Sequence, residues 1–175
     1  MTERATVEAI ANNVRIAMKY AEALVSDVPP PRFSRFAAGT RGPIESNHPA
    51  WIIGHLALYP GRAASMLELE ADVAVPSDWE DLFGPKSICV DDDDASRYPS
   101  RDELVGRFMA AQNSIAGAIL RLDDASLARE TPLERYRQRF PTLTSAVDFL
   151  LTTHAMFHLG QLSAWRRSEG LGPAM

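Results

Sequence analysis

The sequence contains one cysteine, no long apolar run and no excess of positive charge. Because Cys89 has no partner within the chain, an intramolecular disulfide framework is excluded, and a single thiol is typical of a reducing compartment. A membrane-spanning helix needs about 20 consecutive apolar residues, and no stretch approaches that length. The charged N-terminal stretch also lacks the apolar region of a signal peptide. We therefore expect a cytoplasmic protein with no membrane association.

The balance of charge disfavours nucleic acid as a partner. The chain carries 18 basic and 23 acidic residues, a net charge of −5, whereas nucleic-acid affinity depends mostly on neutralising phosphates. The hydrophobic fraction of 46% and the charged fraction of 23% are close to the averages of globular proteins. A length of 175 residues fits one domain. We expect a single soluble domain that covers residues 1–175.

Helical periodicity dominates the sequence, and no segment alternates in the manner of a strand. Apolar residues recur at steps of three and four in four long segments. These segments predict helices over 3–26, 48–70, 101–122 and 143–168. Ser100 and Glu103 have the spacing of a capping box at the start of the third. Four helices of this length, joined by long loops, predict an all-α four-helix bundle.

Two features interrupt this pattern. Pro60 removes a backbone donor and its ring clashes with the carbonyl four residues earlier, so we predict a kink or break of the second helix between Leu56 and Gly61. The connection over 71–99 is long enough to be functional or mobile. Its acidic run, Asp91 to Asp94, is typical of a solvated loop, with cation binding as the alternative.

Three histidines lie on predicted inward faces. His154 and His158 are four residues apart, so both imidazoles project from one helix face about 6 Å apart along the axis. His55 has the periodicity of the buried side of the second helix. Two interpretations remain open from spacing alone: a metal-ligand set, or core histidines satisfied by hydrogen bonds. A zinc-protease mechanism is excluded, because Ala155 occupies the position of the general base in that motif.

Two sequence motifs resemble the DinB/YfiT-like superfamily. They are NHPAWIIGHLALYPGR at 47–62 and HAMFHLGQLSAWRR at 154–167, the latter followed by GLGP. The resemblance implies a four-helix bundle with a three-histidine site for a divalent metal ion, nickel or zinc, and a homodimeric assembly. Carried onto this sequence, it implies that His55, His154 and His158 are the metal ligands. Pro60, one turn after His55, departs from the family pattern.

Further residues have expected places near this site. Gln161 belongs to the H-x-G-Q signature of the resemblance and could hold a ligand imidazole by a hydrogen bond. Tyr59 shares the face of His55, either as a hydrogen-bond donor or as an ordinary core tyrosine. His48 lies about 10.5 Å from His55 along the helix axis, too far to share the ion. We predict it at the helix end or the pocket rim.

The connection before the second helix predicts the chemistry of the pocket mouth. Residues 29–45 must reach the N-terminal end of that helix, which we expect to be open to loops. They bring with them Arg32, Phe33, Phe36 and Arg41. We predict an anion-tolerant mouth whose guanidinium groups suit the carboxylates of a small thiol or an acidic substrate, with solvated loop arginines as the alternative.

The resemblance also implies a class of activity. Relatives include metal-dependent transferases and isomerases that use low-molecular-weight thiols such as bacillithiol and mycothiol, together with a small-molecule substrate. A metal-dependent hydrolase is an alternative, although no Asp or Glu shares the histidine face of the fourth helix. A non-catalytic, stress- or damage-inducible metal-binding protein is a third interpretation, because a shared fold does not fix function.

Overall fold

The structure, a computed structural model, describes residues 4–174 and contains helices but no strand in that part of the chain. This confirms the all-helical prediction. The helices are, in chain order, α1 (Ala5–Val25), the 3-10 turn η1 (Pro30–Arg32), α2 (Pro49–Ala57), α3 (Tyr59–Leu67), α4 (Trp79–Phe83), α5 (Arg101–Ile119), α6 (Asp124–Leu127), α7 (Glu134–Arg137), α8 (Leu143–Asp148), the π-helix η2 (Phe149–Thr153) and α9 (His154–Ser168). Within residues 4–174, no helix combines the length and apolar character needed to cross a membrane.

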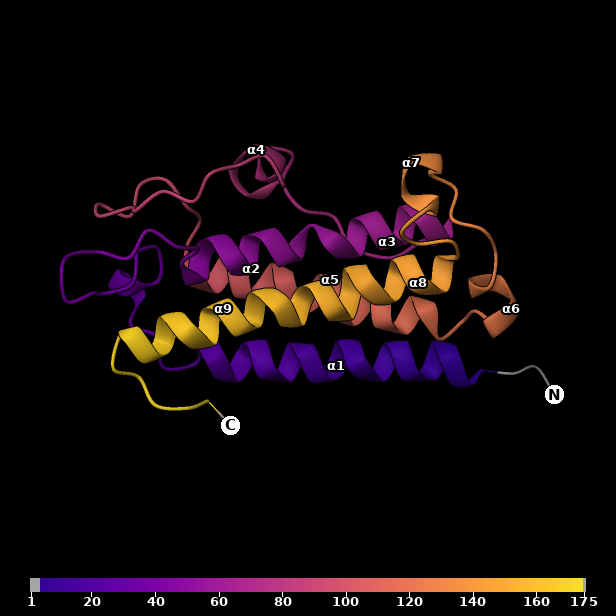
Figure 1. Cartoon of the computed structure of the whole chain (residues 1–175), viewed down its shortest axis with the longest axis horizontal. Coiled ribbons are helices and arrows are strands. Elements are labelled where there is room, and N and C mark those ends of the chain that lie inside the picture. Colours follow the sequence, from indigo (N-terminus) through magenta and orange to yellow (C-terminus); the bar gives the residue numbers. More distant parts are fainter. Residues whose placement is uncertain (1–3, 175) are drawn as a thin grey trace.

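The long helices run side by side along the long axis of the molecule (Figure 1). α1 packs against α5 and α9, and α2 packs against the same two helices, so α1 and α2 occupy opposite corners. α3 continues the line of α2, and α8 and η2 lead directly into α9. The short helices α4 and α7 lie along one outer edge, beside α2 and α3 (Figure 1).

Apolar side chains fill the space between these helices in two clusters. One cluster joins α2, α4 and α9 with the C-terminal half of α1. The other joins α3, α8 and the N-terminal half of α1 with the C-terminal half of α5. Burial of this apolar surface stabilises the arrangement. The histidines face one another in the region of the first cluster, where α2 and α9 pack together.

The predicted helix ends agree closely with the structure. α1 ends at Val25, one residue before the predicted end, while residue 3 lies outside the described residues. α5 begins at Arg101, where the Ser100 hydroxyl accepts the Glu103 N–H at 3.2 Å. The Glu103 carboxylate instead accepts from Arg107 at 3.5 Å, so only half of the expected capping box is present.

The second helix breaks where Pro60 predicts. α2 ends at Ala57 and α3 begins at Tyr59. Pro60 has no N–H to offer the carbonyl of Leu56, four residues earlier. The buried Gln112 of α5 donates its Nε2 to that carbonyl at 3.5 Å. A side chain from a neighbouring helix thus partners the carbonyl that the proline leaves free.

We predict that Gln112→Leu lowers the free energy of unfolding by about 1 kcal/mol, because the Leu56 carbonyl loses this donor. In a Pro60→Ala background the loss should be smaller, because Ala at position 60 supplies an N–H. Urea denaturation of the two single variants and the double variant measures the coupling. Purely additive effects would show that Gln112 does not compensate for the proline.

The fourth predicted helix has the expected bounds but an irregular interior. A π-turn, Phe149–Thr153, separates α8 from α9. Beside it, Thr152 Oγ1 donates to the Asp148 carbonyl at 2.6 Å. A π-turn adds one residue to the helix and rotates the residues after it about the helix axis, and it is frequent at functional sites. Here it directly precedes His154.

The connection over 71–99 is anchored rather than loose. Trp79 and Phe83 of α4 are 1% and 0% exposed. The Asp92 carboxylate accepts the backbone N–H groups of Ser96, Arg97 and Tyr98. Among residues 4–174 the acidic run forms no converging group of carboxylates suited to a metal ion. Asp92 therefore shapes the loop.

Candidate metal centre

Three imidazoles from two helices converge on one point. His154 Nε2 lies 3.1 Å from His158 Nε2 and 3.4 Å from His55 Nε2. One ligand atom from each of the three residues lies within 4.8 Å of the others. Nitrogens bound roughly 2.1 Å from one ion are separated by about 3.4 Å in tetrahedral geometry and about 3.0 Å at adjacent octahedral positions. The two observed nitrogen separations fit both geometries.

Hydrogen bonds fix the tautomers of two of these rings. His55 Nδ1–H donates to the Phe83 carbonyl at 2.6 Å, and His158 Nδ1–H donates to Gln161 Oε1 at 3.0 Å. The Phe83 carbonyl oxygen and Gln161 Oε1 can only accept hydrogen bonds, so the ring proton of His55 and of His158 sits on Nδ1. The Nε2 of each ring therefore presents a lone pair. These two lone pairs converge on His154 Nε2, and a cation between the three nitrogens would make this convergence favourable. The donor set therefore fits a divalent metal ion.

Burial keeps the three imidazoles neutral. It lowers the pKa of His55 to about 4 and, together with the neighbouring His158, the pKa of His154 to about 3. Burial also lowers the pKa of His158. Neutral imidazole is the form that binds metal ions, so the site is in its ligand form at neutral pH.

His55 owes its orientation to a glycine one residue earlier. Gly54 faces the ring of Phe83, and a Cβ at Gly54 would lie 2.6 Å from three of its ring carbons. The absence of a side chain lets α4 pack directly on α2. This close approach brings the Phe83 carbonyl within reach of His55 Nδ1.

We predict that Gly54→Ala weakens zinc binding about tenfold or more, although it changes no ligand, because partners of ligating imidazoles are worth 10- to 100-fold in affinity. It should also destabilise the fold, since the added methyl group overpacks the core. Competition titration with a chromogenic chelator measures the affinity.

Gly160→Ala is the matched control. Gly160 lies on α9 near the site, but a Cβ there would meet nothing within 4 Å. This substitution should leave zinc affinity unchanged and slightly stabilise the helix. Wild-type zinc affinity in Gly54→Ala would show that the Phe83 contact does not position His55.

Gln161 connects the site to the start of α2. Its Oε1 accepts from His158 and also from Asn47 Nδ2 at 3.2 Å. Asn47 lies two residues before the first residue of α2. His158 is thus held through a chain of amides that begins just before α2, the other helix of the site.

Tyr59 packs against two of the imidazoles. Its ring lies 4.2 Å from that of His154 and 5.0 Å from that of His55. Burial raises the pKa of its hydroxyl, so Tyr59 is a protonated phenol at neutral pH. His154 relies on such ring contacts, because its Nδ1 has no hydrogen-bond partner in the described part of the chain.

His48 lies at the helix end and not at the pocket rim. It is fully buried and caps α2: its Nδ1 accepts the Trp51 N–H at 3.2 Å. Its Nε2–H donates to the Val90 carbonyl at 3.0 Å. Arg41 is exposed in the loop before α2 and does not line the pocket.

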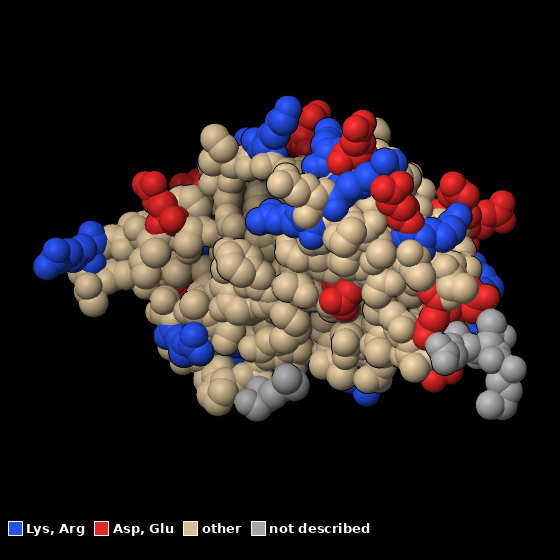
Figure 2. Space-filling model, turned by 45° about the vertical axis from the view of Figure 1, so that its right-hand side comes forward, with Lys and Arg blue, Asp and Glu red and all other residues tan. Residues whose placement is uncertain are grey.

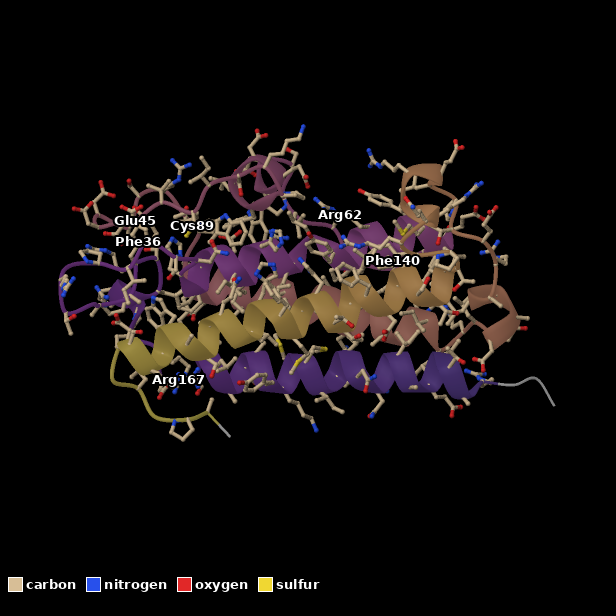
Figure 3. The ribbon with its side chains drawn as sticks, in the orientation of Figure 1. Phe36, Glu45, Arg62, Cys89, Phe140 and Arg167 are labelled. Atoms are coloured by element: carbon tan, nitrogen blue, oxygen red, sulfur yellow. The ribbon has the colours of Figure 1, made fainter. Side chains whose placement is uncertain are left out.

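A pocket of about 580 Å³ opens onto the three imidazoles. Figure 3 shows three of its residues, Phe36, Glu45 and Cys89, close together near the N-terminal end of α2. The lining residues are Phe36, Glu45, Ser46, Asn47, Trp51, His55, Tyr59, Pro85, Ser87, Ile88, Cys89, His154 and His158. No arginine or lysine of residues 4–174 is among them. The arginines that we expected at the pocket mouth, Arg32 and Arg41, are therefore not among the residues that line this pocket.

Two arginines of the loop before α2 form ion pairs away from the pocket. Arg32 forms a bidentate pair with Glu169, at 2.7 Å through both its Nε and its Nη2. Arg35 binds Asp91 in the same way, at 3.0 Å. These guanidinium groups tie the loop before α2 to the C-terminal end of α9 and to the 71–99 connection.

The sequence pattern missed three residues at this site. Trp51 stacks on the His55 ring at 4.6 Å with 14° between the planes, a contact that its position four residues earlier on α2 could have indicated. Glu45 and Cys89 come from loops, where no periodicity signals the pocket. Burial raises the pKa of Cys89 to about 11, so its thiol is protonated.

These features define a class: an all-helical protein with a buried three-histidine cluster suited to a divalent metal ion. The family model of the DinB superfamily matches residues 9–162. The chain therefore belongs to the DinB superfamily, as the two sequence motifs predicted. No curated protein matches the chain.

Acid should destabilise the metal-free protein in a defined window. The pKa values of His48 and His55 are lowered to about 4 and that of His154 to about 3, against about 6.5 in the unfolded chain. The unfolded state therefore binds more protons below pH 6.5, and stability is lost as the pH falls from about 6.5 toward 4. One pH unit below 6.5, each of these histidines lowers the free energy of unfolding by roughly 1 kcal/mol.

Thermal denaturation of chelator-treated protein between pH 7.5 and pH 4.5 measures this effect. Hydrogen bonds from Arg166 and Arg35 hold the pKa values of Asp27 and Asp91 below their ordinary value, so these carboxylates titrate below the window. A melting temperature that stays constant between pH 6.5 and 5 would contradict the low histidine pKa values.

Proposed function

We propose that this protein binds one divalent metal ion, nickel or zinc, through His55, His154 and His158, and acts as a metal-dependent transferase or isomerase that uses a low-molecular-weight thiol. The observation that carries the proposal is the convergence of three neutral Nε2 atoms at the floor of an open pocket. Three protein ligands leave coordination positions for a reactant, which is typical of catalytic sites. A divalent ion there would lower the pKa of a bound thiol so that the thiolate predominates at neutral pH.

The residues of the pocket suit a thiol-bearing molecule. Trp51, Phe36 and Ile88 give the wall an apolar part that can contact the carbon skeleton of the bound molecule. Asn47 and Ser87 offer polar groups to amides or hydroxyls of the bound molecule. Tyr59 keeps its proton and can donate it to a group that develops negative charge near the imidazoles.

Metal-dependent hydrolysis is a second candidate because one carboxylate lines the pocket. Glu45 is a pocket residue, and a carboxylate near a metal centre can act as a general base. It lies in the exposed loop before α2, away from the histidine faces of the helices. Thiol chemistry ranks first because a coordinated thiol needs no protein base.

Metal titration tests the central claim. Chelator-treated protein, purified without metal-affinity chromatography, should bind one equivalent of Zn²⁺ or Ni²⁺ in isothermal titration calorimetry. His154→Ala should weaken binding more than about a hundredfold, beyond the effect of losing an outer partner. The control is His48→Asn, which removes a buried histidine but keeps a good cap, and it should retain binding. Equal affinity in wild type and His154→Ala would refute the assignment of the site.

Cobalt substitution separates thiol chemistry from hydrolysis. Adding bacillithiol or mycothiol to the Co²⁺-loaded protein should produce a thiolate-to-cobalt charge-transfer band in the near ultraviolet. Glu45→Gln should leave that band unchanged, whereas it would abolish a hydrolase activity that uses Glu45 as base. A metal-loaded protein that gives no band with either thiol supports the non-catalytic or hydrolytic interpretation.

We also propose that the chain is one domain, a four-helix bundle with long loops, and forms a homodimer in the cytoplasm. The contacts of α1 and α2 with both α5 and α9 support the bundle. Exposed Met156 and Phe157 on α9, at 43% and 66%, offer apolar surface for a second subunit.

A further inference from the structure

A second, larger groove, lined in part by α4, also reaches the histidine cluster. Its volume is about 1080 Å³, and α3, α4, α7 and α8 all contribute to its walls. Tyr59, Pro85 and His154 line both this groove and the first pocket. The two cavities therefore meet at the imidazole of His154.

The groove has the opposite charge to the rest of the protein. Its lining contains four cationic residues, Arg62, Lys86, Arg135 and Arg139, against two acidic ones, Glu80 and Asp81, in a chain of net charge −5. Figure 2 shows basic and acidic side chains gathered along the upper part of its face, the edge that carries α4 and α7 in Figure 1, above a mostly uncharged region.

The arginines of the groove differ in how they are paired. Arg62 binds both carboxylate oxygens of Glu80, at 2.8 and 3.0 Å, and lies 4.8 Å above the Tyr59 ring. Within residues 4–174, Arg135 and Arg139 form no ion pair. They are four residues apart at and just after α7. A pair of unmatched guanidinium groups suits a carboxylate or a similar anion.

The floor between these arginines and His154 is apolar and aromatic. Phe140 and Phe149 pack with ring centroids 4.8 Å apart, and Leu150 and Ala146 extend the surface. Leu133 and Tyr136, at the same wall, are 41% and 37% exposed. Arg62 and Phe140, labelled in Figure 3, belong to α3 and to the segment between α7 and α8.

We propose that this groove binds an amphipathic organic anion, a molecule with a carboxylate at one end and an apolar or aromatic body. The carboxylate binds Arg135 and Arg139, the body lies on Phe140 and Phe149, and the far end reaches Tyr59 and His154. The inference deepens the proposed function and in that respect rests on it: the thiol occupies the first pocket, and the anion is the second reactant, which approaches the same metal centre through the second groove.

Binding of 2-naphthoate tests the groove without requiring activity. Fluorescence titration of metal-free protein should show saturable binding that weakens about five- to tenfold in Arg135→Gln/Arg139→Gln, because a charge-assisted pair is lost at a solvent-exposed rim. The matched control, Arg15→Gln, removes an exposed cation on α1 and should leave affinity unchanged. The neutral analogue 2-naphthamide should bind the double variant and the wild type equally.

Two further measurements keep this test separate from the metal claim. Zn²⁺ affinity should be unchanged in the arginine double variant, so loss of naphthoate binding with normal metal binding supports the groove alone. Amide chemical shifts should move over 133–150 on addition of naphthoate, and not over 45–47. Binding that requires Zn²⁺ and ignores both arginines would mean that the carboxylate coordinates the metal, and would overturn the proposal. So would shifts confined to the first pocket.

Discussion

The convergence of three imidazole Nε2 atoms is the constraint on which the site depends. His158 and His55 present Nε2 lone pairs to His154 Nε2 at 3.1 and 3.4 Å, and a neutral His154 has only one ring proton, which cannot satisfy both fully. The rings are therefore also held by their other contacts. For His55 the Phe83 carbonyl does this, and for His158 the amide of Gln161. His154 is held by packing against Tyr59. The contacts with Phe83, Gln161 and Tyr59 thus hold the three imidazoles in place.

Two local departures from regular helix stand next to the ligands. The helix of His55 ends at Ala57, just before Pro60, and the π-turn of η2 ends at the residue before His154. A straight helix fixes the direction of each side chain by its 3.6-residue period. The π-turn sets the direction of His154 and His158 together, because both lie on α9, whereas His55 is oriented independently on α2. Gln112 and Thr152 supply hydrogen bonds at these breaks.

Periodicity predicted the helices and the three histidines because both are properties of local spacing. The break at Pro60 was also predictable, because the sequence itself shows that a proline lacks the backbone N–H. Periodicity could not locate Phe83 beside Gly54, because that contact depends on how α4, a short helix within the 71–99 connection, packs against α2. The amide chain from Asn47 to Gln161 spans more than a hundred residues of sequence and has no local signal.

The ion pairs of Arg32 and Arg35 could not be predicted for a related reason. Their carboxylate partners come from distant segments of the chain. Whether an arginine is paired is a tertiary property, and it decides whether the cation is available to a ligand.

The position of α4 links these observations. Its two aromatic anchors, Trp79 and Phe83, are almost completely buried and pack edge to face at 5.2 Å, which fixes the carbonyl that orients His55. The next segment, with Pro85 and Cys89, forms a wall of the first pocket, while Glu80 and Asp81 face the second groove. α4 thus contributes to the wall of the second groove and orients one ligand of the site, while the segment that follows it lines both cavities. Because Trp79 and Phe83 fix the position of α4, the residues of α4 that line the second groove, Glu80 and Asp81, are free to vary with what that groove binds.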